Sequence, residues 1–242
     1  MNQPENRSEI VRLENVSKVF GVNGHGTTAV QAVTLSLSAG ELVLLLGPSG
    51  SGKTTLLTLM AGLIEPSEGR VLLFGDDVRE YSEEELQRLR ARRLGFIFQN
   101  FLLIESLSVL ENITLVLRFA GKDGAEVRLA ARNLLREFNI DRFADRFPAK
   151  LSQGEKQRVA IARAMANGGE LIIADEPTAS LESKRALEII RLLQSLAKDQ
   201  NKCVVVASHD LRLVEFADRV FRMRDGAIDE EVRVSGLATR SG

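Results

Sequence analysis

A glycine-rich segment at residues 47–54 constrains the fold of this chain more than any other feature, because it matches the G-x-x-x-x-G-K-[ST] pattern in full. It follows an apolar run at 42–46 and precedes a helical pattern over 55–61. Glycines let the backbone wrap around a phosphate chain, and the amides at the next helix N-terminus point at the anion. Lys53 adds a positive charge, and Thr54 offers a hydroxyl to Mg²⁺. The segment therefore predicts a phosphate-binding loop between a strand and a helix.

Three short apolar runs, at residues 42–46, 171–174 and 203–207, are bounded by Gly, Asp or Ser. Such runs are typical of strands that are buried on both faces of a mainly parallel sheet, with helices between them. The alternation of Val33, Leu35 and Leu37 with polar residues, and a short strand pattern over 71–74, predict an antiparallel flank. The predicted fold class is therefore α/β, with a mainly parallel sheet and an antiparallel β flank.

Helix starts are marked by capping boxes, in which a serine and a glutamate three residues later satisfy the free amides of the first turn. The predicted pairs are Ser82 with Glu85, Ser108 with Glu111 and Ser152 with Glu155. Between 99 and 167 the pattern is helical with no strand-like run, and Asp225-Gly226 between two strand patterns predicts a hairpin. We expect a single domain over 1–242, with a core and β flank formed by 10–98 and 169–234, an inserted helical subdomain over 99–168 and a tail over 235–242.

Composition argues against several classes of protein. The chain has 32 Lys+Arg against 33 Asp+Glu, a net charge of −1, whereas a nucleic-acid binder usually has a basic excess. Its single cysteine, Cys203, allows no intramolecular disulfide and makes the cytosol the default compartment. The polar first residues do not resemble a leader peptide. Because the longest apolar runs have four or five residues, against about 20 for a spanning helix, we expect a chain that does not cross a membrane.

The run at 171–174 ends in Asp175 and Glu176, at the sheet edge where α/β proteins present ligand groups. We expect Asp175 to hold the Mg²⁺ shell, and Glu176 to orient and deprotonate an attacking water. Taken alone, such a pair is also explained by a surface turn. Beside a phosphate loop it predicts nucleotide hydrolysis.

Residues 151–155, Leu-Ser-Gln-Gly-Glu, open a helical pattern that by itself is explained by a capped amphipathic helix. The segment is similar to the signature L-S-G-G-Q and lies shortly before the Asp-Glu strand, so the chain resembles the nucleotide-binding subunit of an ABC transporter. This resemblance implies a P-loop NTPase with a RecA-like core, ATP and Mg²⁺ as cofactors, and a homodimer with ATP at the seam. In that dimer Ser152 of one subunit would contact the γ-phosphate of ATP held by the other subunit's phosphate loop.

Over roughly residues 10–228, three more residues match the family pattern. Phe20 falls where an aromatic ring stacks on adenine, Gln99 ends a Gly-Phe-Ile-Phe run like the Q-loop, and His209 follows residues 204–208 like the switch histidine. Each is separately explained as a core ring, a strand end or a neighbour of a helix cap. The resemblance implies catalytic roles for Glu176, His209, Gln99 and Lys53, and metal ligands at Thr54, Gln99 and Asp175. The implied cofactor-binding residues are Phe20, Gly47, Pro48, Ser49, Gly50, Ser51, Gly52, Lys53, Thr54, Thr55, Ser152, Gly154 and Glu155.

The sequence departs from the family pattern at three places. Gln153 and Glu155 replace the usual Gly and Gln of the signature, and Leu181-Glu182 stands where Leu-Asp is usual, which bears on intersubunit coupling at the dimer seam. Residues 98–103 and 107–113 resemble the branch of lipoprotein-releasing, macrolide-export and cell-division ATPases, but the branch's usual proline is absent near Ile104.

The function that the resemblance implies is ATP hydrolysis at the cytoplasmic face of the inner membrane. It would power export or release of a lipoprotein, a lipid or a drug through a separate membrane permease. The alternatives are a membrane-tethered mechanical or regulatory ATPase of the cell-division type, an ABC ATPase of DNA repair, and a small-molecule kinase. A DNA-repair ATPase would need long heptad arms or a basic face, neither of which is visible, so no nucleic-acid partner is expected.

A docking site for the permease is predicted directly after Gln99, where apolar residues come too densely for one helix stripe. We expect Phe101, Leu103 or Leu107 to line a cleft that accepts a short helix of the permease. The alternative is that all of these side chains belong to the core of the helical subdomain.

Overall fold

The computed structural model describes residues 8–21 and 26–234. The predicted tail over 235–242 lies outside the described residues. Strands β1 to β10 have the bounds Glu9–Phe20, Thr27–Ser38, Leu42–Leu46, Glu68–Leu73, Asp76–Asp77, Leu94–Ile97, Leu171–Asp175, Cys203–Ser208, Arg219–Arg224 and Ala227–Arg233. Helices α1 to α6 have the bounds Lys53–Met60, Glu83–Arg93, Val109–Phe119, Ala125–Glu137, Gln153–Met165 and Ser183–Asp199.

A six-stranded core sheet has the order β10-β9-β3-β8-β7-β6. All neighbouring pairs from β9 to β6 are parallel, and only the edge strand β10 is antiparallel. Every residue of β3, β7 and β8 is buried, as expected for strands with helices on both faces. Strands β9 and β10 form the predicted hairpin, in which Asp225 and Gly226 both have positive φ.

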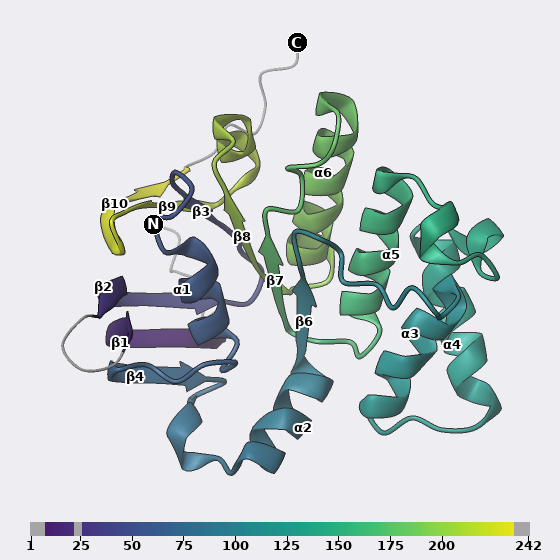
Figure 1. Cartoon of the computed structure of the whole chain (residues 1–242), viewed down its shortest axis with the longest axis horizontal. Helices are drawn as coiled ribbons and strands as arrows, with labels where there is room; N and C mark the ends of the chain where they lie inside the picture. The colour runs from purple at the N-terminus through teal and green to yellow at the C-terminus, as the bar shows by residue number, and fades with distance from the viewer. Residues whose placement is uncertain (1–7, 22–25, 235–242) are drawn as a thin grey trace, which may run out of the picture.

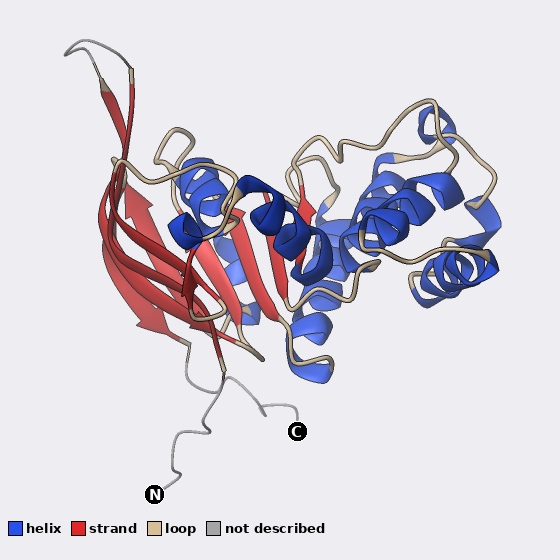
Figure 2. Cartoon of the chain, turned by 90° about the horizontal axis from the view of Figure 1, so that it is seen from below, coloured by secondary structure: helices blue, strands red, loops and turns tan. Residues whose placement is uncertain are grey.

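The flank is a second sheet of order β2-β1-β4-β5, antiparallel throughout, which confirms the predicted class of fold. Helix α1 packs between the two sheets: Leu56, Leu57 and Met60 share one buried cluster with residues of both. On the other face of the core sheet, α6 packs in a second cluster together with the helices of residues 99–168, which we call the helical segment. Figure 2 shows the strands gathered on one side of the molecule and helices massed on the other.

Helices α3, α4 and α5 lie side by side, away from the flank sheet (Figure 1). Residues 99–168 contain these helices and no strand in the described structure, although the predicted boundaries of a subdomain stay a prediction. All three predicted capping boxes are present, at the starts of α2, α3 and α5. Among the described residues, no helix has both the length and the apolar character that a bilayer span requires.

Candidate functional site

The parallel strands of the core sheet bring the phosphate loop, the acidic pair and His209 together at one edge. Strand β3 leads into the loop before α1, β7 ends at Asp175, and β8 ends just before His209. Carboxyl ends of parallel strands meet at the same edge, where α/β folds bind ligands. A cleft of about 370 Å³ lies there, and it is lined by Thr27, Thr28, Ala29, Ser49, Gly50, Gly52, Lys53, Thr54, Thr55, Gln99, Asp175, Glu176 and His209.

Lys53 and Thr54, the first residues of α1, face the acidic pair. The Thr54 hydroxyl donates to Asp175 Oδ2 at 2.8 Å. Lys53 Nζ donates to the carbonyl oxygens of Gly47 at 2.8 Å and Pro48 at 2.9 Å. The same ammonium lies 3.7 Å from Glu176 Oε1. The phosphate loop thus holds its own lysine beside the cleft, while the threonine hydroxyl and Asp175 already contact each other.

Glu176 is held in place from two directions. Its backbone has φ 47°, and its amide donates to the Ala207 carbonyl at 3.0 Å. His209 Nδ1 lies 3.0 Å from Glu176 Oε1. A carboxylate that has lost its proton can only accept, so in this contact Nδ1 would be the donor. A carboxylate oriented by a neighbouring side chain is the arrangement expected of a general base.

Two carboxylate oxygens in the cleft have no hydrogen-bond partner among the described residues: Asp175 Oδ1 and Glu176 Oε2, both buried. Burial raises the pKa of Asp175, as does the nearby charge of Glu176, against the effect of the Thr54 hydroxyl. Buried polar atoms without partners are costly, so such atoms commonly await a ligand, an ion or water. This donor set fits Mg²⁺, which takes one or two carboxylates together with phosphate oxygens.

The remaining residues predicted around the loop lie close by. Gly47 donates its amide to the Ser208 carbonyl at 3.2 Å, and Ser51 is buried. Phe20, predicted to stack on adenine, does not line the cleft and is 47% exposed. It pairs across the flank sheet with Thr27, which does line the cleft, and the Lys18 ammonium lies 5.3 Å from the centre of its ring. Phe20 on β1 therefore lies directly beside a residue of β2 that lines the cleft.

Ser152, Gly154 and Glu155 lie elsewhere, at the start of α5, where they line a small cavity beside α6. Within the chain, Glu155 caps the helix: its Oε2 accepts from the Ser152 amide and hydroxyl, both at 2.8 Å. Burial acts to raise the pKa of Glu155, but these hydrogen bonds outweigh it and the pKa is lowered. One chain thus does not bring the signature segment into the cleft.

Sequence reasoning missed the contribution of β2, whose Thr27, Thr28 and Ala29 line the cleft. Gly52, with φ 96°, lies so close to this strand that a Cβ there would overlap the Ala29 carbonyl oxygen. The sequence indicates this close approach only through Gly52, a glycine that the phosphate-loop pattern requires. The pattern does not identify the strand that approaches it.

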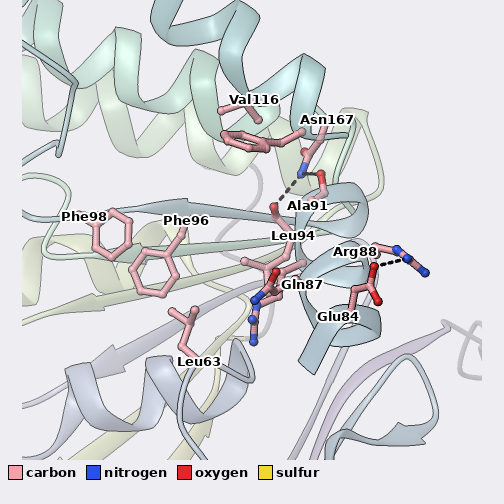
Figure 3. Close-up of a pocket in the computed structure, with 12 residues that line it drawn as sticks. Leu63, Glu84, Gln87, Arg88, Ala91, Leu94, Phe96, Phe98, Val116 and Asn167 are labelled. Atoms are coloured by element: carbon pink, nitrogen blue, oxygen red, sulfur yellow. Dashed lines mark hydrogen bonds and ion pairs between the residues drawn. The ribbon is translucent and has the colours of Figure 1, made fainter. Parts of the chain in front are cut away.

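A second hollow, which we call the lateral groove, lies between α2, the edge strand β6 of the core sheet and α3 (Figure 3). It has a volume of about 540 Å³ and is lined by Leu63, Glu84, Gln87, Arg88, Arg90, Ala91, Leu94, Phe96, Phe98, Val116, Phe119 and Asn167. Phe96 and Phe98 stack with ring centres 4.2 Å apart. Phe98 lines this groove and the next residue, Gln99, lines the cleft, so adjacent residues of one segment reach both sites.

The predicted docking residues lie outside the lateral groove, and whether they contact a permease stays a prediction. Phe101 is only 9% exposed and packs in the core of the helical segment, and Leu103 is half-buried against the same core. A second cavity continues the groove and shares with it Leu94, Phe96, Phe98, Val116, Phe119 and Asn167. Phe101, Leu103 and Leu107 line neither the lateral groove nor this continuation. The physical reason is a tight turn, with left-handed φ at Phe101 and Leu102, which directs Phe101 inward and leaves Leu102 56% exposed.

Comparisons with known proteins agree with this geometry. Residues 30–179 match the protein family described as ABC transporter. The chain is 38% identical over 235 residues to the uncharacterized ABC transporter ATP-binding protein MJ0796 of Methanocaldococcus jannaschii, covering 96% of this chain and 100% of that protein. It is 40% identical over 219 residues to the macrolide export ATP-binding/permease protein MacB of Brucella melitensis, covering 90% of this chain but 34% of MacB.

A solved structure is similar over nearly the whole chain. The dimer of MJ0796 in a post-hydrolysis state, bound to ADP and Pi, superposes with a TM-score of 0.87 at 38% identity, covering 94% of this chain and all of that one. The matched region includes the phosphate loop and the acidic pair described above. From its site geometry and from these matches, the chain belongs to the ABC transporter family, as an ATP-binding domain.

Proposed function

We propose that this chain binds Mg²⁺-ATP in the cleft and hydrolyses it as a homodimer, at the cytoplasmic face of the inner membrane, to drive a separate permease. The observation that carries the proposal is the meeting, at one sheet edge, of a lysine, a hydroxyl and two carboxylates with unpartnered oxygens. ATP hydrolysis is the activity of the family, and the related MJ0796 structure holds ADP and Pi.

Phosphate binding falls to the loop and the start of α1. Lys53 would exchange its bonds to the loop carbonyls for the terminal phosphates, since a phosphate oxygen is the stronger acceptor for an ammonium. Thr54, Asp175 and Gln99 would hold Mg²⁺, which when bound neutralises charge on the phosphates. Phe20 would stack on adenine from β1, beside the cleft-lining Thr27 of β2.

Glu176 would be the general base. Its Oε2 is unpartnered and free to accept a proton from water, while Oε1 is held by His209. His209 is 64% exposed, so its other ring nitrogen remains accessible from the open side of the cleft. Orientation of a base by a second side chain removes motions that would otherwise have to be frozen in the transition state.

The dimer is supported by the separate position of the signature segment. Ser152, Gly154 and Glu155 lie away from the cleft of their own chain, so they reach an ATP only if a second copy presents them. The related MJ0796 cassette is dimeric.

The permease would dock in the lateral groove. Phe119 and Leu63 are 72% and 45% exposed there, and such apolar surface favours an amphipathic helix as occupant. The groove's rim charges are already paired, since Arg88 bonds Glu84 and Arg90 bonds Glu83, so apolar anchors would supply the affinity. MacB, by its name, combines ATP-binding and permease parts, and this chain matches about a third of it. We propose export or release of a cargo as the work performed.

The nucleotide site is tested by Lys53→Ala, with the exposed Lys122→Ala as a charge-matched control. Charge-assisted hydrogen bonds contribute about 1.5–3 kcal/mol each, so ATP affinity should fall roughly 10–100-fold by calorimetry. Unchanged affinity in Lys53→Ala, or an equal loss in the control, would contradict the assignment.

The docking site is tested by Phe119→Ala, with Leu129→Ala as the control, because Leu129 is 60% exposed on α4 and lines neither the lateral groove nor its continuation. The measurement is saturable binding of the purified chain to vesicles of its host's inner membrane, with protease-stripped vesicles as the blank. A groove anchor should be worth about 1–3 kcal/mol, so affinity should fall roughly 5–100-fold for Phe119→Ala alone. Normal binding by that variant would place the docking site elsewhere.

A further inference from the structure

The turn that follows Gln99 has an unusual backbone. Phe101 and Leu102 have φ 60° and 46°, two consecutive non-glycine residues in the left-handed region. Local bonds close the turn: the Phe101 amide donates to the Phe98 carbonyl at 3.0 Å, and the Leu102 amide to the Asn100 carbonyl at 2.6 Å. Side chains clash with the backbone in this region, so the conformation persists only where its surroundings hold it.

Arg163 of helix α5 is the group that holds this turn. Its Nη2 donates to the Phe101 carbonyl at 2.8 Å, and its Nη1 donates to the Leu102 carbonyl. The guanidinium is half-buried, and burial lowers its pKa. In the described part of the chain Arg163 forms no ion pair, so both bonds of this charged group go to the two strained residues. A planar guanidinium donates to the two successive carbonyls from two nitrogens in a fixed fork, whereas an ammonium would have to reach both from one nitrogen.

The two ends of this link belong to different parts of the ATP machinery. On one side, Gln99 lies two residues before Phe101 and lines the cleft. On the other, Ser152 caps the same helix that carries Arg163, eleven residues earlier, or about 16 Å along a helix axis. An intact helix is stiff over this length, so a shift of the turn is passed to the signature end of α5.

We propose that Arg163 is a positioning residue that fixes Ser152 relative to Gln99 within one chain. The inference rests on the proposed function, in which one ATP contacts Gln99 of one subunit and Ser152 of the other. The dimer can enclose both ATPs at once only if the distance and orientation between Gln99 and Ser152 are fixed within each chain. A group that is ordered before association lowers the entropy lost on binding, so the link should strengthen ATP-dependent dimerisation.

The test uses the full chain carrying Glu176→Gln, in which ATP should persist. Arg163→Ala removes both hydrogen bonds, and Arg163→Lys keeps the charge without the fork. Arg191→Ala is the control, because it removes the same charge from an exposed position on α6. Three quantities are measured: hydrogen exchange at the amides of 100–104, Mg²⁺-ATP affinity of the monomer by calorimetry, and the ATP-dependent dimerisation constant by sedimentation.

For Arg163→Ala we expect exchange at 100–104 to rise at least tenfold, the monomer's ATP affinity to stay within about threefold, and dimerisation to weaken at least tenfold. Arg163→Lys should fall between the parent and Arg163→Ala, and Arg191→Ala should match the parent. This split separates a positioning role from a structural one, since a residue that only stabilises the fold would change the melting temperature but not the dimerisation of folded chains.

The inference would be overturned if Arg163→Ala dimerised as tightly as the parent although exchange at 100–104 had risen. It would also be overturned if exchange at 100–104 did not change. If Arg163→Ala does not fold, the same two outcomes are decided on Arg163→Lys. A parent that binds no Mg²⁺-ATP, or binds it and stays monomeric, would instead refute the proposed function, which is a distinguishable failure.

Discussion

Asn112 of α3 anchors the loop that follows the Gln99 turn, and its removal should have a measurable cost. The side chain is 1% exposed, and its Oδ1 accepts from the Ile104 amide at 2.8 Å. Its Nδ2 lies within hydrogen-bond distance of the carbonyls of Ile104 at 3.2 Å, Leu107 at 3.2 Å and Ser108 at 3.0 Å. One side-chain amide thus bonds the backbone at both ends of the loop at 104–108.

Asn112→Ala deletes all of these bonds. Each is worth about 0.5–1.5 kcal/mol net, and leaving a buried group without a partner costs about 1–3 kcal/mol. Nδ2 has only two hydrogens for its three carbonyls, so with the bond accepted by Oδ1 the side chain makes at most three bonds at once, and their loss should cost about 2–4 kcal/mol. For a domain of this size each kcal/mol lowers the melting temperature by about 2–4 °C, so the expected drop is about 4–16 °C.

The assay is thermal unfolding followed by circular dichroism, with nucleotide absent. Asn133→Ala on the exposed face of α4 is the matched control and should stay within about 0.5 kcal/mol of the parent. ATP affinity should be unchanged in Asn112→Ala, because Asn112 does not line the cleft. A drop below about 2 °C for Asn112→Ala, or an equal drop for the control, would refute the reasoning.

Two further predictions concern packing and the signature serine. Gly95→Ala in β6 would place a Cβ against the Ala164 carbonyl and 2.9 Å from Ile172 Cδ1, so overpacking should destabilise the fold by about 1–3 kcal/mol or more, measured by urea unfolding; a neutral result would mean that α5 can move away freely. Ser82→Ala and Ser152→Ala both remove the serine of a capping box and should each cost about 1 kcal/mol of stability. Only Ser152→Ala should also weaken ATP-dependent dimerisation in sedimentation, and equal dimerisation of the two variants would remove Ser152 from the shared site.

Local signals in the sequence predicted much of the fold. The three capping boxes, the hairpin at Asp225-Gly226 and the strand-loop-helix setting of the phosphate loop depend on residues a few positions apart, and all are present. Strand β1 was missed because its alternation is broken: its register shifts between Leu13 and Val16, around Asn15, which has φ 51°. A bulge adds one residue to the strand, so the side chains after it alternate in the opposite phase. The alternating pattern of apolar and polar residues is therefore interrupted in the sequence.

Contacts between distant segments were harder to predict. The parallel order of β3, β7 and β8 explains why Lys53, Glu176 and His209 meet, and the sequence indicated that order only through its buried runs. The burial of Phe101 could not be predicted, because it depends on a strained turn that Arg163 holds from 62 residues away. An apolar residue in a dense apolar run is consistent with either burial or docking until the backbone conformation shows which way its side chain points.

The most direct test of the shared-ATP account is Glu176→Gln, measured for both turnover and assembly. A general base contributes about 10²–10⁴ in rate, or roughly 3 to 5 kcal/mol of barrier, so hydrolysis should fall by that factor while the fold and ATP binding persist. In sedimentation with Mg²⁺-ATP the variant should accumulate as a dimer that holds one ATP per chain. Wild-type turnover, or a saturated ATP complex that stays monomeric, would contradict the account.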